Sequence, residues 1–93
     1  MFQTIMTFCA RIQNGRTIPD VYNAAVDETN ELCDEVDKFQ SGYPPGDDGI
    51  IGEAVDCILC HMDLIYQSDP DITETELMSI IVRKLEKWER KYG

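Results

Sequence analysis

Acidic residues recur at helical spacing in two separate segments of the chain. The first segment, residues 27–37, reads DETNELCDEVD. At about 100° per residue in a helix, three of its acids lie on or beside the apolar side: Glu28, Glu31 and Glu35. The second segment confines its polar residues to one stripe, composed of Glu53, Asp56, Asp63 and Gln67. This stripe contains no lysine or arginine, which is unusual for a surface that faces only solvent.

Carboxylates placed in this way favour a divalent cation. A carboxylate buried without a partner costs several kcal/mol, and like charges one helical turn apart repel by roughly 0.2–0.5 kcal/mol per pair. A cation would remove both penalties. Hard oxygen ligands suit Mg²⁺ or Mn²⁺, and Mg²⁺ keeps waters that can be activated or exchanged for phosphate oxygens. The residue types therefore predict a magnesium–phosphate site. The alternative is that both sets of acids only line a solvated groove or a subunit interface.

Four helices are expected to position these residues. Apolar residues at helical spacing cover residues 2–12 and stop at Asn14-Gly15. Pro19 and Asp20 can open a second helix, which reaches about residue 40 before the loop SGYPPGDDG. A third helix runs from about residue 50 to 67. Thr73 with Glu76 gives the capping-box signature of a fourth. No segment shows strand alternation, so the predicted fold class is all-α.

The apolar positions predict which helix faces are buried. The buried face of the second helix is expected to contain Val21, Leu32, Val36 and Phe39. The third helix is apolar around nearly its whole circumference, so we expect it to be central and buried. The fourth helix carries an apolar stripe made of Leu77, Ile80, Ile81, Leu85, Trp88 and Tyr92. A chain of 93 residues allows one domain with a modest core, residues 1–93. Because the third helix is too apolar for a lone small bundle, we expect further copies to complete this domain.

Charge and hydropathy exclude several classes of partner. The net charge of −10 argues against a nucleic-acid polymer, whose phosphates require a basic surface. The bases are concentrated at one end: residues 1–82 contain 16 acids and three bases, whereas residues 83–93 contain five bases and two acids. No apolar run reaches the roughly 20 residues of a membrane span, and the N-terminus lacks the features of a secretory signal. We therefore expect a cytoplasmic protein without a membrane partner.

The cysteines are expected to be reduced, buried thiols. They are Cys9, Cys33, Cys57 and Cys60. Residues 57–61 spell CxxCH, the attachment sequence of c-type haem, but they lie in the most apolar helix of a chain without an export signal. Cys9 and Cys33 lack the CxxC spacing of a zinc site. A di-iron bundle is not favoured either, because neither Glu28 nor Glu53 has a histidine three residues later.

The two acidic segments resemble a known family. Glu28-Thr29-Asn30-Glu31, a gap of 21 residues, and Glu53-Ala54-Val55-Asp56 resemble the ExxE…ExxD arrangement of the MazG-like all-α nucleoside triphosphate pyrophosphohydrolases. That family also includes dimeric dUTPases and dCTP pyrophosphatases. The segment KLEKWERKYG resembles the basic helix end that often closes such domains. The likeness covers residues 20–93.

The resemblance implies an activity and a set of site residues. The activity is Mg²⁺-dependent hydrolysis of a nucleoside triphosphate between its α- and β-phosphates, which gives a monophosphate and pyrophosphate. The resemblance makes Glu28, Glu31, Glu53 and Asp56 the catalytic metal ligands, with Glu31 or Glu28 orienting the attacking water. Residues expected to contact the substrate are Lys84, Lys87, Arg90, Lys91, Asp63 and Trp88. The family assembles as homodimers or homotetramers.

One departure from the family pattern and two alternative interpretations stand beside this assignment. Trp88 stands where family members often have an asparagine, so the preferred base is not indicated. The competing class is a non-enzymatic helical adaptor, whose acidic groove binds a partner, a metal or a nucleotide. A basic helix end also has a purely structural explanation, because cations near a helix C-terminus interact favourably with the helix dipole.

Overall fold

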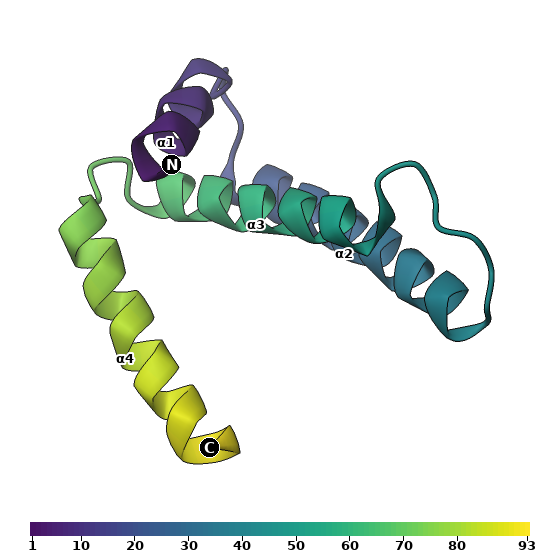
Figure 1. Cartoon of the computed structure of the whole chain (residues 1–93). Helices are drawn as coiled ribbons and strands as arrows, with labels where there is room; N and C mark the ends of the chain where they lie inside the picture. Colours follow the sequence, from purple (N-terminus) through teal and green to yellow (C-terminus); the bar gives the residue numbers. More distant parts are fainter.

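Four helices and no strand make up the computed structural model, which describes residues 1–93 (Figure 1). They are α1 (Phe2–Arg11), α2 (Ile18–Gln40), α3 (Gly49–Ser68) and α4 (Glu74–Tyr92). The all-α prediction is confirmed, and each helix begins and ends within about two residues of the expected position. None of the four combines the length and the apolar character needed to cross a membrane.

Capping boxes determine where α2 and α4 begin. The Thr73 hydroxyl accepts a hydrogen bond from the Glu76 amide (3.1 Å), and the Glu76 carboxylate accepts one from the Thr73 amide (3.1 Å), as predicted. Thr17 and Asp20 form the same reciprocal pair at the start of α2, with Pro19 in the first turn. That second box was not anticipated, although Thr17 and Asp20 have the required spacing.

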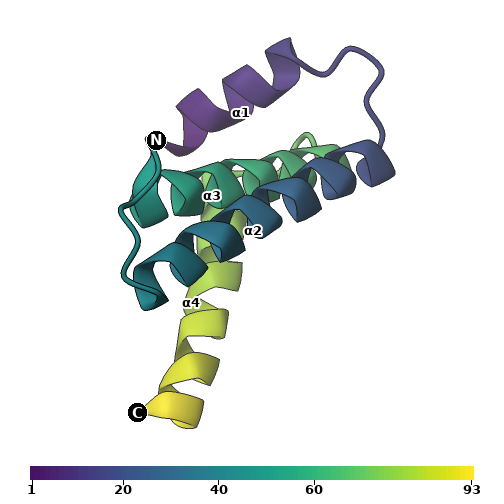
Figure 2. The same cartoon turned by 90° about the vertical axis from the view of Figure 1, so that its right-hand side faces the viewer.

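Helices α2 and α3 pack side by side as a hairpin, and α1 lies against α3 (Figure 2). Helix α4 leaves the end of α3 and extends away from the hairpin in both views, without extensive contact with the other helices (Figures 1 and 2). The chain is consequently expanded. Its radius of gyration is 15.4 Å, compared with about 12 Å for a compact domain of this length.

The core of one subunit is small. Six apolar residues are buried: Met6, Cys9, Val21, Ala25, Cys57 and Leu77. The expectation that α3 is buried all round is wrong for the single chain, because Ile51, Val55, Ile58 and Leu59 are exposed. The stripe of α4 is likewise exposed beyond Leu77, because only the start of α4 is covered and the rest of the helix makes no extensive contact with the other helices.

Two smaller predictions about burial are also wrong. Phe39, near the end of α2, is 73% exposed and lines an open hollow with the loop and the first turn of α3. All four cysteines are free thiols, as expected, and Cys9 and Cys57 are buried. Cys33, however, is exposed on the outer side of α2.

Glu35 holds the loop between α2 and α3. Its Oε1 accepts a hydrogen bond from the Gly46 amide (2.6 Å), and its Oε2 lies 3.5 Å from Lys38 Nζ. A Cβ at position 46 would lie 3.0 Å from Glu35 Oε2, so this close approach favours glycine. Glu35 therefore points inward, as its helical phase predicted, but it stabilises a loop.

Candidate metal centre

Four carboxylates meet between α2 and α3. Glu28 and Glu31 come from α2, Glu53 and Asp56 come from α3, and one oxygen of each lies within 4.8 Å of the others. Residues three apart lie on one face of a helix, so each helix of the hairpin presents a pair of acids to the other. These are the four residues that the sequence motifs singled out.

The spacing of these oxygens suits one or two small divalent cations. Opposite ligands around Mg²⁺ lie about 4.2 Å apart, which is twice the Mg–O distance of about 2.1 Å. The four oxygens lie within 4.8 Å of one another, so side-chain movements on the order of 1 Å would let them bind a single ion. A pair of ions would be a second way for the same four carboxylates to bind divalent metal.

The cluster has no internal source of positive charge. Glu28 Oε2 and Glu53 Oε2 are buried and make no hydrogen bond. The two buried charged residues elsewhere are Glu35, paired with Lys38, and Asp63, paired with Arg16. The third cation of residues 1–82, Arg11, lies over the ring of Phe8, 4.9 Å from its centroid. Every cation of the hairpin and α1 is therefore engaged away from the four acids.

Proximity alters the protonation of two of the acids. Burial, and then the neighbouring Glu31 carboxylate, raise the pKa of Glu28. Burial, and then the charges of Glu31, Asp48 and Asp56, raise the pKa of Glu53. Because a carboxylate must lose its proton to bind a metal, cation binding is expected to release protons from these two side chains.

The remaining polar residues of the α3 stripe dock α1 and the segment after it. Asp63 forms a bidentate pair with Arg16, at 2.6 and 3.1 Å, and Gln67 exchanges hydrogen bonds with Gln13. Cys60 lies between Asp56 and Asp63 in the α3 sequence. Burial, and next the charge of Glu28, raise the pKa of Cys60. The stripe thus has two halves, one presenting acids to α2 and one binding Gln13 and Arg16.

Sequence reasoning missed Arg16. The scarcity of bases in residues 1–82 could have indicated its role. An isolated base in such an acidic segment has a strong electrostatic reason to pair with a buried acid. In the structure Arg16 also donates from Nε to the Ile12 carbonyl (2.9 Å), which fixes the guanidinium against the end of α1.

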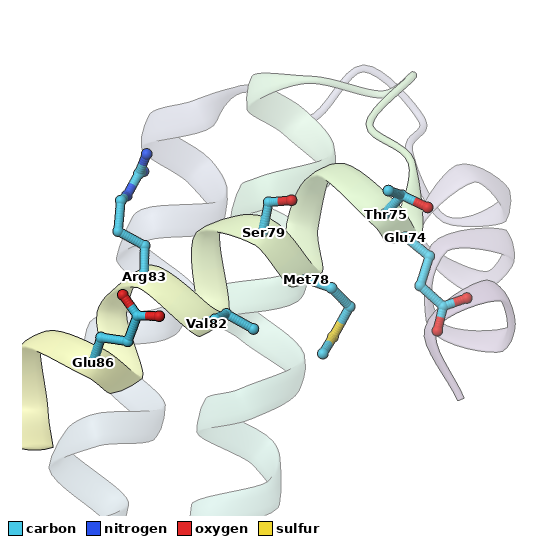
Figure 3. Close-up of a pocket in the computed structure, with 7 residues that line it drawn as sticks. All are labelled: Glu74, Thr75, Met78, Ser79, Val82, Arg83 and Glu86. Carbon is cyan, nitrogen blue, oxygen red and sulfur yellow. The ribbon is translucent and has the colours of Figure 1, made fainter.

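The predicted phosphate-binding cations lie apart from the four acids within one chain. Lys84, Lys87, Arg90 and Lys91 are exposed on α4 and form no salt bridge. Trp88 is 62% exposed on the same helix. A hollow of about 680 Å³ runs along α4 and is lined by its residues alone, among them Met78, Val82 and Arg83 (Figure 3). None of the four acids lines it.

Comparison of the chain with protein-family models, with curated proteins and with solved structures gave no match. The functional argument therefore depends on the geometry and charge of the four carboxylates.

Proposed function

We propose that this protein is a Mg²⁺-dependent nucleoside triphosphate pyrophosphohydrolase of the MazG-like type. It would convert a nucleoside or deoxynucleoside triphosphate to the monophosphate and pyrophosphate, and so clear or adjust nucleotide pools. One observation carries the proposal: four carboxylates from two helices approach within 4.8 Å, and two of their oxygens are buried without a hydrogen bond. Such a cluster fits a divalent cation, and a divalent cation fits a triphosphate.

The roles of the acids follow from their positions. Glu28, Glu53 and Asp56 are partly buried and would hold the metal, whereas Glu31 is the exposed member and can reach a water. When bound, Mg²⁺ neutralises phosphate charge and lowers the pKa of a coordinated water. Mn²⁺ suits the same ligands. Glu31 would orient the attacking water and accept its proton. The water oxygen bonds to the α-phosphorus, the bond from that phosphorus to the bridging oxygen breaks, and pyrophosphate leaves.

We further propose that a homodimer or homotetramer completes the site. The body of the chain is strongly acidic, while α4 ends in Lys84, Lys87, Arg90 and Lys91. The apolar stripe of α4 is exposed, and so are Ile51, Val55 and Ile58 of α3. Packing α4 of one subunit on the hairpin of another would bury both surfaces. It would also bring cations toward the acids, where they could pair with the phosphates of the substrate.

The test is incubation of the purified protein with a panel of ribo- and deoxyribonucleoside triphosphates and Mg²⁺. We expect monophosphate and pyrophosphate, with no orthophosphate, from at least one substrate. Glu53→Gln and Asp56→Asn should each lower kcat at least 100-fold, while Glu86→Gln, an exposed acid on α4, should leave it unchanged. Absence of both products from every triphosphate would refute the enzymatic proposal. Tight Mg²⁺-dependent nucleotide binding without turnover would instead indicate the non-enzymatic module.

A further inference from the structure

A cavity of about 510 Å³ lies between α1, α2 and α3, outside the four-acid cluster. Its walls are mostly apolar and include Ile5, Phe8 and Ile12 of the α1 segment and Leu59 of α3. Its polar side is the Arg16–Asp63 ion pair. The volume is in the range of about 300–1,000 Å³ that is typical of small-molecule sites, and apolar walls with a few fixed polar groups are their usual lining.

The cavity begins one helical turn from the acids on both helices of the hairpin. On α2, Ala24 lines the cavity and Glu28 belongs to the cluster. On α3, Cys60 lines the cavity and Asp56 belongs to the cluster. Four residues correspond to about 6 Å along a helix axis. The cavity and the cluster therefore lie about one helical turn apart along both helices, a distance that a ribose can span.

We infer that this cavity receives the base of the nucleotide whose phosphates bind at the four acids. This inference rests on the proposed function. A planar heterocycle can place its faces against the apolar walls, which include Phe8, although Arg11 already lies over one face of that ring. The phosphates, one ribose away, then lie at the metal ligands.

The ion pair retains capacity to bind the edge of a base. Arg16 has five N–H donors, of which three are used for Ile12 and Asp63. Each Asp63 oxygen accepts one hydrogen bond from Arg16, and one further acceptor position stays available if the neighbouring Cys9 thiol takes the other. Adjacent donor and acceptor groups complement a base edge that carries a carbonyl or ring nitrogen beside an N–H. The Arg16–Asp63 pair, which docks the segment after α1 on α3, is thus also the candidate for base recognition.

The first test is amide NMR of the protein with Mg²⁺ and non-hydrolysable α,β-methylene triphosphates, compared with inorganic tripolyphosphate. Both ligands should shift signals around Glu53 and Asp56, but only the nucleotides should shift Phe8, Ile12 and Leu59. If nucleotides and tripolyphosphate perturb the same signals and leave α1 unchanged, the base does not enter the cavity. That result would leave the cavity to another occupant, such as a side chain of a second copy, while the metal-centred activity stands.

The second test is a substitution whose larger side chain fills the cavity. Ala24 is exposed at its edge, so Ala24→Phe should obstruct the base and raise KM at least tenfold without changing Mn²⁺ affinity by more than twofold. Ala10→Phe places the same side chain on an exposed position of α1 outside the cavity and should leave KM unchanged. Equal KM values for Ala24→Phe and the unmodified protein would overturn the inference. A failure of the proposed function differs, because the unmodified protein itself would then show no turnover.

Discussion

Glu28 of α2 and Glu53 of α3 bring carboxylate oxygens within 4.8 Å of each other, and each has one buried oxygen without a hydrogen bond. In an ordinary surface cluster the acids would separate into solvent or pair with lysine and arginine. Here the three cations of the body are engaged elsewhere, two of them with buried acids. No cation of the hairpin or α1 therefore balances the charge of the four acids, which is the reason for the proposed divalent cation.

Divalent metal is expected to stabilise the fold. A ligand that binds only the folded state raises the free energy of unfolding by about 2.7 kcal/mol at 100 times its Kd, which corresponds to about 10–20 °C in Tm for a small domain. Thermal unfolding in MgCl₂, in MnCl₂ and in EDTA measures this directly. Glu53→Gln should abolish the metal-dependent shift and Glu86→Gln should retain it. The same Tm in EDTA and in saturating metal would contradict the prediction.

Neutralising one acid should stabilise the metal-free protein. Glu28→Gln removes a negative charge beside Glu31, Glu53 and Asp56, and each like-charge neighbour on a helix costs roughly 0.2–0.5 kcal/mol. Urea unfolding in EDTA should therefore show a higher free energy of unfolding for this variant. Asp27→Asn, on the solvent side of the same helix, is the matched control and should change stability less. A lower stability for Glu28→Gln would mean that its charge is already compensated.

The stability of the metal-free protein should fall as the pH rises above the ordinary glutamate range. Burial and Glu31 raise the pKa of both Glu28 and Glu53 in the folded state. The folded protein therefore binds more protons than the unfolded chain between the unfolded pKa of about 4.3 and the higher folded pKa. The stabilisation is full below this window and is lost as the pH rises through it.

Urea unfolding in EDTA across this window measures the slope, and a Glu28→Gln/Glu53→Gln variant isolates the two groups because its slope should be flatter. Asp20 has the opposite effect on the slope. Hydrogen bonds from Thr17 lower its pKa in the folded state, so its contribution to the free energy of unfolding is lost as the pH falls. Identical slopes for the two proteins would show that Glu28 and Glu53 do not have raised pKa values.

The Arg16–Asp63 pair should contribute to stability by joining the segment after α1 to α3. Asp63 is buried while Arg16 is partly exposed, with 12% and 29% of their side chains accessible. Removing one partner should cost about 1–3 kcal/mol, because the other group then lacks a hydrogen-bond partner. A double-mutant cycle with Arg16→Met and Asp63→Leu measures the coupling by urea unfolding. Strictly additive effects would show that the pair is not an energetic unit.

Much of the fold and the site was predictable from local pattern. Spacings of three residues put Glu28 with Glu31 and Glu53 with Asp56 on single helix faces, and the capping signature at Thr73 located the start of α4. Local pattern does not determine which distant groups meet. Asp63 pairs with Arg16 across 47 residues of sequence, and Glu35 binds the Gly46 amide of a loop. Periodicity identifies the apolar stripe of α4 but not the surface that covers it.

Helix α4 should mediate self-association through its exposed apolar stripe. Leu85 and Trp88 are 53% and 62% exposed, and placing a charge among such residues in an interface leaves it buried and unpaired. Leu85→Glu/Trp88→Glu should therefore convert a dimer or tetramer to monomers. Light scattering after size-exclusion chromatography measures the mass. Ser79→Glu, on the other side of α4, should preserve the assembly. A monomeric unmodified protein at micromolar concentration would contradict the proposed oligomer.

Anomalous diffraction from a crystal soaked with Mn²⁺ and a non-hydrolysable nucleoside triphosphate tests the central claim most directly. We predict an anomalous peak between α2 and α3, about 2.0–2.3 Å from oxygens of at least one acid of each helix, with phosphate oxygens completing its coordination. Manganese bound elsewhere, or no manganese at saturating concentration, would contradict the assignment of Glu28, Glu31, Glu53 and Asp56 as a metal centre.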